Sequence, residues 1–228
     1  MSEKRWIQTY TEWIEALNTL GFMLFSGDET GLLTLGTLTH PDAWHTGDQE
    51  TDPWAWKDRL VAEHRGVCAR ILHGRQTFVS FAWYPHFLAA FRPETSLEVR
   101  YAMGVLDATT WRMAQLFQTR SEWARHELTR ALDVTGKEKA RFDRALTALQ
   151  REMAITASGQ TQRTAYNGAP MGWPSMTYMR TEVWARPEDL EAASCLSKAQ
   201  ALTEICARAR QISPQWDARA GKKLFGGE

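Results

Sequence analysis

The chain has 228 residues, of which 43% are hydrophobic and 11 are tryptophans, enough to bury one large core or two smaller ones. Its 27 basic and 27 acidic residues give a formal net charge of zero, which excludes a uniformly basic surface. The charges are unevenly spread, because residues 1–60 hold four basic and ten acidic residues, whereas the remaining 168 hold 23 and 17. We therefore expect any polyanion to bind to the later part of the chain. The alternative is that the uneven distribution of charges has no functional meaning.

The cysteine content and the apolar runs indicate a cytoplasmic protein. The three cysteines, Cys68, Cys195 and Cys206, form no C-x-x-C pair and are odd in number, which argues against a disulfide framework. No apolar run approaches the roughly 20 residues that span a bilayer. The N-terminus reads Met-Ser-Glu-Lys-Arg-Trp and lacks the apolar segment of a signal peptide. We expect no membrane partner, and a nucleoid-associated location if the protein binds DNA.

The N-terminal part is predicted to be helical with an aromatic end. A first helix is indicated by apolar residues at helical spacing from Trp13 to Leu20, with Thr9 or Thr11 as cap and Gly21 as terminator. Residues 26–53 resemble a long connection, and a second helix is predicted from Trp54 or Trp56 to about Leu72. An aromatic stretch follows over 78–91, and we expect it to be buried.

Three helices in close succession, followed by a hairpin, are predicted next. Asp107, Ser121 and Thr135 are the expected N-caps of the three helices. Residues 154–157 and 175–183 favour strands and are separated by a loop rich in Gly, Asn and Pro. This order is typical of a winged helix. A last helix is predicted over 187–211, and Lys222 and Lys223 fall in a tail that we expect to be flexible.

The third of these helices has a basic face opposite an apolar face. On a wheel of 100° per residue, Arg141, Arg144 and Arg151 lie within about 40° of Lys137. The apolar residues lie about 120–180° away and are Phe142, Leu146, Leu149 and Met153. A recognition helix needs this arrangement, with one face in a core and the other towards phosphates and base edges. The alternative is a solvated surface helix.

Three further groups are candidates for contact with DNA or for catalysis. Arg163, in the loop of the hairpin, is expected to reach the DNA backbone, and Gln160 and Gln162 beside it carry amides that can orient a water or read adenine. The segment 44–56 crowds Asp48, Glu50 and Asp52 around an aromatic group consisting of Trp44, Trp54 and Trp56. Carboxylates near aromatic rings can act as acid or base, and tryptophans can hold an extruded base. The alternatives are an ordinary polar hairpin and an ordinary loop whose tryptophans fill a core.

We expect neither a metal nor a cofactor. His64, Cys68 and His73 fall on or beside one predicted helix, but zinc needs three or four converging ligands and no partner motif is visible. A structural role for these residues is therefore favoured. Motifs of the G-x-S-x-G type and glycine-rich phosphate loops are absent from the sequence.

Much of the chain resembles bacterial proteins of the AlkZ-related family. The resemblance rests on Trp44-His45-Thr46-Gly47, Thr51-Asp52-Pro53-Trp54, Thr77-Phe78-Val79-Ser80, Trp83-Tyr84-Pro85, Phe87-Leu88-Ala89-Ala90, Gly104-Val105-Leu106-Asp107, Phe142 to Gln150 and Gly172-Trp173-Pro174-Ser175. It implies winged-helix architecture and kinship with AlkZ and YcaQ, DNA glycosylases that remove alkylated bases. Their hallmark is a Gln-x-Gln or Gln-x-Asp that positions water. Gln160-Thr161-Gln162 matches its letters but has threonine where the motif prefers an apolar residue.

Together these observations predict a mainly α protein with small β-hairpins, of mixed α+β class. We expect a helical and aromatic N-terminal region (1–92), a winged-helix domain (93–186) and a C-terminal helix with a tail (187–228). The predicted partner is double-stranded DNA, contacted by Lys137, Arg141, Arg144, Arg151 and Arg163. Glycosylase-like removal of alkylated bases, with Gln160, Gln162 or Asp52 aiming a water, is the catalytic hypothesis. The alternatives are a non-enzymatic DNA-binding regulator and a winged-helix module for protein interaction.

Overall fold

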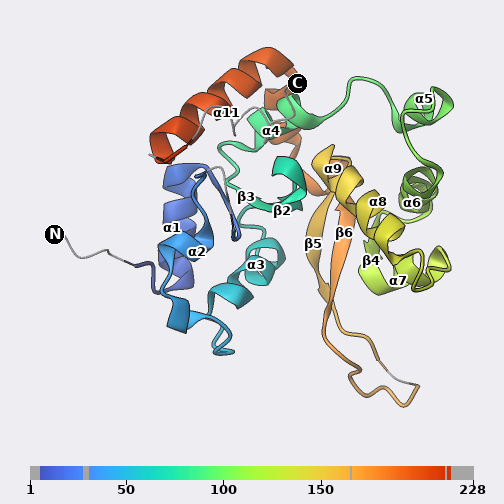
Figure 1. Ribbon diagram of the computed structural model, residues 1–228, viewed down its shortest axis with the longest axis horizontal. Helices are drawn as coiled ribbons and strands as arrows, with labels where there is room; N and C mark the ends of the chain where they lie inside the picture. Colours follow the sequence, from blue (N-terminus) through green and yellow to red (C-terminus); the bar gives the residue numbers. More distant parts are fainter. Residues whose placement is uncertain (1–5, 28–30, 165, 214, 217–228) are drawn as a thin grey trace.

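The computed structural model describes residues 6–27, 31–164, 166–213 and 215–216. It confirms the mixed α+β class, with helices packed around two antiparallel sheets of three strands each (Figure 1). The tail that contains Lys222 and Lys223 lies outside the described residues. Within the described part of the chain, no helix is long and apolar enough to cross a membrane.

The N-terminal part builds the first sheet, in the strand order β1-β3-β2. Strand β3 is central and pairs antiparallel with both neighbours. The elements are α1 (Tyr10–Leu20), β1 (Phe22–Leu24), α2 (Leu35–Leu38), the 3-10 helix η1 (Pro41–Ala43), α3 (Pro53–Ala62), β2 (Val67–Arg70), η2 (Leu72–Gly74), β3 (Gln76–Val79) and α4 (Tyr84–Phe91).

Helix α1 begins and ends where the sequence predicts. The Thr9 side chain accepts a hydrogen bond from the backbone N–H of Glu12, which caps the first turn. Gly21 ends the helix with a positive φ of 96°. A Cβ at this position would lie 2.5 Å from the Trp83 ring, so both the backbone conformation and the close approach require glycine.

The single helix predicted from Trp54 or Trp56 to about Leu72 is wrong. Helix α3 ends at Ala62, and residues 67–70 form β2 instead. Gly66 directly precedes the strand, at a position where a Cβ would lie 3.1 Å from the Leu60 side chain and from the Val79 carbonyl oxygen. The segment 67–69 is buried against β3, so strand pairing overrides the helical spacing.

The same correction separates the histidine and cysteine that the sequence placed on one helix. His64 lies exposed in the turn after α3, whereas Cys68 is buried in β2. Burial raises the pKa of the Cys68 thiol to about 11, which disfavours the thiolate that metals bind. Among the described residues there is no group of three or more His, Cys, Asp and Glu side chains placed to hold a metal ion.

The C-terminal half builds the second sheet, in the strand order β4-β6-β5. Its elements are α5 (Leu97–Ala102), α6 (Ala108–Thr119), β4 (Glu122–Ala124), α7 (Arg125–Ala131), α8 (Lys139–Arg151), β5 (Ile155–Thr161), β6 (Ser175–Arg180) and α9 (Thr181–Trp184). The three predicted helices and the hairpin are all present. Asp107 caps α6 by accepting hydrogen bonds from the N–H groups of Thr109 and Thr110.

The starts of α7 and α8 differ from the predicted caps. Helix α7 begins at Arg125, four residues beyond Ser121, because residues 122–124 form β4 and pair with β6. Helix α8 begins at Lys139, and Thr135 lies in the turn before it, where the Glu138 carboxylate accepts hydrogen bonds from the Thr135 N–H and hydroxyl. The predicted last helix is likewise two helices, α10 (Pro187–Ser194) and α11 (Lys198–Ile212), the second capped by Ser197.

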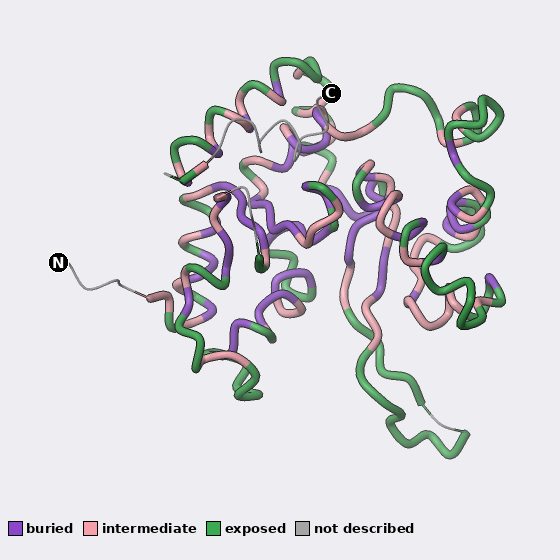
Figure 2. The backbone as a smooth tube through the Cα atoms, viewed as in Figure 1, coloured by how far each residue is buried: buried purple, intermediate pink, exposed green. Residues whose placement is uncertain are grey.

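The two halves of the chain pack against each other. Helices α10 and α11 cover α4, and β5 lies against α3 and β2. The Thr156 hydroxyl donates to the Cys68 carbonyl at 3.4 Å, and the Gln150 amide oxygen accepts from the Arg70 N–H at 3.2 Å. Figure 2 shows the buried backbone concentrated in the two sheets and the helix faces turned towards them. The division at 92/93 and 186/187 stays a prediction.

Two tryptophans of α3 provide a test of this core. Trp56 is fully buried and stacks on Trp13 with ring centroids 5.8 Å apart, whereas Trp54 is 45% exposed. We expect Trp56→Ala to lower the free energy of unfolding by about 3–5 kcal/mol, because it leaves a large cavity. Trp54→Ala, the matched control, should cost less than about half as much. Chemical denaturation measures both, and equal losses would contradict this core.

Candidate nucleic-acid interface

Helix α8 has one face in a core and the opposite face in solvent. Phe142, Leu146 and Leu149 are buried in a cluster with residues of α6 and α7. Arg141, Arg144 and Arg151 are exposed on the other side, and Lys137 is exposed in the turn that precedes the helix. The arrangement predicted on the helical wheel is therefore present within α8, but Lys137 precedes the helix, and Met153 lies beyond its end and is buried in a different core cluster.

The exposed cations of this face form no close ion pair in the described part of the chain, although the charge of Arg141 helps to lower the pKa of the Glu138 carboxyl. Among the described residues, none of Lys137, Arg141, Arg144, Arg151 and Arg163 forms an ion pair, whereas six other arginines do: Arg59, Arg92, Arg100, Arg120, Arg125 and Arg186.

The acidic residues on and beside α8 are already engaged. The Asp143 carboxylate is held 2.6 Å from the Arg125 guanidinium, and the Glu152 carboxylate forms a two-bond pair with Arg100 at 2.6 Å. Glu138 caps the turn at Thr135, and the N–H and hydroxyl of Thr135 hold the pKa of the Glu138 carboxyl below its usual range. The basic face therefore keeps its charge available for an anionic partner.

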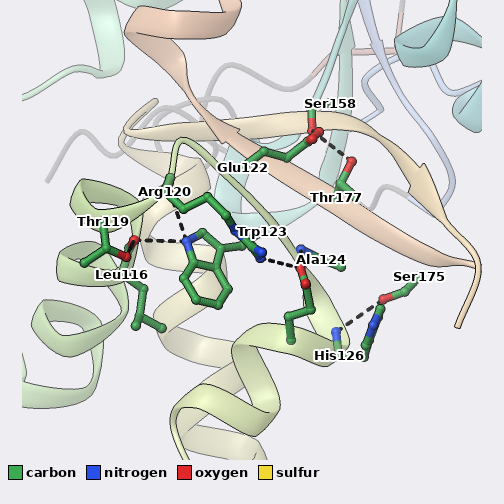
Figure 3. Close-up of polar contacts among 11 residues, drawn as sticks. Leu116, Thr119, Arg120, Glu122, Trp123, Ala124, His126, Ser158, Ser175 and Thr177 are labelled. Atoms are coloured by element: carbon green, nitrogen blue, oxygen red, sulfur yellow. Dashed lines mark hydrogen bonds and ion pairs between the residues drawn. The ribbon is translucent and has the colours of Figure 1, made fainter. Parts of the chain in front are cut away.

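The loop between β5 and β6 projects beyond the sheet as a long exposed wing, defined here as residues 162–164 and 166–174 (Figures 1 and 2). Its base is fixed by side chains from all three strands of the sheet. The Ser158 hydroxyl donates to the Glu122 carboxylate at 2.6 Å and lies 2.9 Å from the Thr177 hydroxyl (Figure 3). Arg163, at the start of the wing, is exposed.

Helix α7 is anchored between the end of α6 and the start of β6 (Figure 3). The Trp123 indole N–H donates to the carbonyl oxygens of Leu116 and Arg120, at 2.9 and 3.1 Å. The backbone N–H of His126 donates to the Ser175 hydroxyl at 3.3 Å. The Trp123 bonds fix β4, which leads directly into α7, and the His126 bond holds the start of α7 beside the foot of the wing.

An open groove of about 680 Å³ lies between α7 and the wing. Its walls include His126 and Arg130 from α7, and Arg163 and Trp173 from the wing. The pKa of His126 is lowered, chiefly by burial and further by the positive charges of Arg163 and Arg130. Sequence reasoning missed this groove, although the glycine, tryptophan and proline at 172–174 stood out in a polar loop.

The two glutamines of the predicted water-positioning motif lie at the foot of the wing. Gln160 is in β5 opposite Met176, and both glutamine side chains are exposed. Gln162 lies just past the end of β5, two residues beyond Gln160. The Gln162 amide N–H₂ donates to the carbonyl oxygens of Met171 and Gly172, at 3.3 and 3.1 Å, which ties the two limbs of the wing together.

Asp52 caps helix α3. It is 2% exposed, and its two oxygens accept hydrogen bonds from the N–H groups of His45, Gly47 and Trp54 at 2.9–3.0 Å. Burial alone would raise the pKa of Asp52, but these bonds outweigh it and hold the pKa below its usual range. The carboxylate therefore shapes the 45–54 segment, and a role for Asp52 in catalysis stays a prediction.

The three tryptophans of the acidic segment do not line one pocket. Trp56 is buried in the core, with no exposed face for a base. Trp44 and Trp54 each pack edge-on against Phe25, with ring centroids 5.3 and 5.8 Å apart. The segment leads into α3, and Trp44 and Trp56 pack in one cluster with Ala157 of β5 and Met176 of β6.

Replacing Asp52 should destabilise the fold without requiring any role in catalysis. Asp52→Ala leaves three backbone N–H groups without their acceptor and should cost about 2 kcal/mol of unfolding free energy at neutral pH. Because the folded-state pKa is lowered, this stabilisation is complete above the ordinary Asp value of about 3.9 and is lost as pH falls through the folded-state value. Denaturation of both proteins at several pH values should show their difference narrowing below about pH 4.

The control for this measurement is Asp42→Ala, because the Asp42 side chain is 90% exposed. It should change the unfolding free energy by less than about 0.5 kcal/mol. A loss at Asp42 equal to that at Asp52, or a difference at Asp52 that does not depend on pH, would contradict the capping role.

Comparison with known proteins identifies the family of this chain. The curated proteins give no match, and neither do the solved structures. A family model described as AlkZ related matches residues 7–226, nearly the whole length. The chain therefore belongs to the AlkZ-related family.

Proposed function

We propose that this protein binds double-stranded DNA through a winged-helix unit made of α6, β4, α7, α8, β5 and β6, with α8 as the recognition helix. The order helix, strand, helix, helix, hairpin supports this assignment, as does the sheet order β4-β6-β5. The observation that carries the proposal is the unpaired basic face of α8. Membership of the AlkZ-related family agrees with it.

The arginines of α8 can bind phosphates because they are unpaired, and this matters more for the proposal than how many there are. A guanidinium that is already paired gains little from a phosphate, because the existing ion pair must first be broken. Arg141, Arg144 and Arg151 have no such pair to break, and α8 spaces them over 10 residues, about 15 Å, which is comparable to the width of the major groove that it would enter. Arg163 in the wing would contact the neighbouring backbone, which carries no sequence information by itself.

We also propose that the protein hydrolyses the glycosidic bond of an alkylated base. Alkylation puts a positive charge on the base, so the electrons of the breaking bond return to the base nitrogen and neutralise it. A water adds its oxygen to the C1′ carbon of the sugar and loses its proton to solvent. Gln160 and Gln162 both lie exposed at the foot of the wing, and among the described residues their amide oxygens have no hydrogen-bond partner, so they are available to orient this water.

Charge reversal on α8 tests the DNA-binding proposal. The double variant Arg141→Glu with Arg144→Glu should weaken binding to a duplex by at least roughly tenfold. It should also reduce the number of ions released on binding, measured from the salt dependence of the affinity, by about two. Fluorescence anisotropy at several salt concentrations measures both quantities. Lys198→Glu with Arg210→Glu is the matched control, because it makes the same change of net charge at exposed residues of α11.

The control variant should bind as the parent does. Equal weakening by the two double variants would show that only net charge matters. No binding by the parent at low salt would overturn the proposal and leave a module for protein interaction.

Base release tests the catalytic part separately. With an alkylated duplex, Gln160→Ala and Gln162→Ala should each lower the rate of base release by roughly a hundredfold while leaving duplex affinity unchanged. Thr161→Ala is the control, because its side chain points to the other side of β5. Release by the glutamine variants at the parent rate would remove these residues from the reaction. Binding without release by the parent would favour a regulator.

A further inference from the structure

The groove between α7 and the wing contains two residues that the proposed duplex binding does not use, Arg130 and Trp173. Arg130 and Arg163 approach it from opposite walls, and neither forms an ion pair among the described residues. Both are close enough to His126 to lower its pKa. The other arginine of the groove, Arg125, is held by Asp143, and Asp133 is the acidic residue of the lining. The available charge of the groove is therefore positive.

An exposed tryptophan stands at the edge of these charges. The Trp173 side chain is 90% exposed, whereas Trp13, Trp56 and Trp184 are buried. It is carried between Gly172, which has a positive φ of 69°, and Pro174. Exposing a large indole to water is unfavourable. Covering the Trp173 ring with a flat apolar surface would therefore lower the free energy of the system.

The groove also adjoins the basic face of α8. Asp133 and Val134 belong to its lining, and the chain then runs through Lys137 into the helix at Lys139. A strand of DNA that leaves a duplex bound at α8 would therefore meet Arg130 and Arg163 within a short distance along the backbone. The volume of about 680 Å³ is within the range of about 300–1,000 Å³ that is usual for ligand sites.

We propose that this groove binds an unpaired DNA segment beside the duplex, with Arg130 on its phosphates and Trp173 stacked on a base. The occupant must be unpaired, because the faces of bases within a duplex are covered by their neighbours and cannot stack on an indole. Stacking on aromatic rings next to a basic groove is how proteins commonly hold single strands. This inference rests on the proposed DNA binding and names the structural class of DNA that the protein prefers.

The test compares a blunt duplex with the same duplex carrying a short single-stranded extension that contains 2-aminopurine. The parent should bind the extended duplex about tenfold more tightly, and 2-aminopurine fluorescence should fall on binding as the base stacks. Trp173→Ala should abolish both the preference and the quenching while leaving affinity for the blunt duplex unchanged. Trp173→Phe should keep part of both, because a smaller ring still stacks.

Trp54→Ala is the matched control, since Trp54 is a partly exposed tryptophan outside the groove. It should leave both DNA affinities and the quenching as in the parent. Arg130→Glu should remove the preference for the extension as Trp173→Ala does.

The outcomes separate this inference from the DNA-binding proposal. A parent that binds both DNAs equally, or a Trp173→Ala variant that keeps the preference, would overturn the groove as a single-strand site and leave duplex binding intact. Equal weakening of both DNAs by Trp173→Ala would make Trp173 a duplex contact instead. A parent that binds neither DNA would overturn both proposals.

Discussion

Strand β6 holds the C-terminal half together, because it is the central strand of the second sheet. It pairs with β4 on one side and β5 on the other, so both edges of its backbone are hydrogen-bonded. The pairing with β4 fixes the start of α7, and the pairing with β5 fixes the foot of the wing. The groove between α7 and the wing exists only because one strand sets the position of both walls.

A second set of contacts ties this sheet to the N-terminal part. Thr156 and Gln150 hydrogen-bond to the backbone of β2, at Cys68 and Arg70. Ala157 is buried in the N-terminal cluster that contains Trp13 and Trp56. The Arg100–Glu152 pair, with both side chains less than one-fifth exposed, joins α5 to the end of α8. These contacts fix the C-terminal end of α8. They therefore also fix the orientation of its exposed basic face.

The distribution of ion pairs explains how a chain of zero net charge can present a basic surface. Carboxylates elsewhere are paired with arginines, as in Arg186–Asp189, where Asp189 is buried, and Arg59 with Glu50 and Glu63. These pairs neutralise their own surroundings and are local in effect. The outer face of α8 and the groove keep unpaired cations. Positive charge is therefore concentrated on this side of the molecule, although the net charge of the chain is zero.

The sequence by itself determined the elements whose signals are local. Helix α1 with its Thr9 cap and Gly21 end, the Asp107 cap of α6 and the two faces of α8 depend on neighbours a few residues away, so a linear pattern predicts them. The hairpin of β5 and β6 was predicted for the same reason, because turn residues separate two β-favouring segments.

Only the tertiary structure decided the short strands and the roles of single side chains. Strands β2 and β4 have four and three residues, too few for a periodic signal, and they form because β3 and β6 lie beside them. Only the positions of its three backbone donors show that Asp52 caps α3, and only the stacking against Trp13 shows that Trp56 belongs to the core. Arg130 and Trp173 are 43 residues apart in the chain and meet in one groove because distant segments converge there, which no local pattern records.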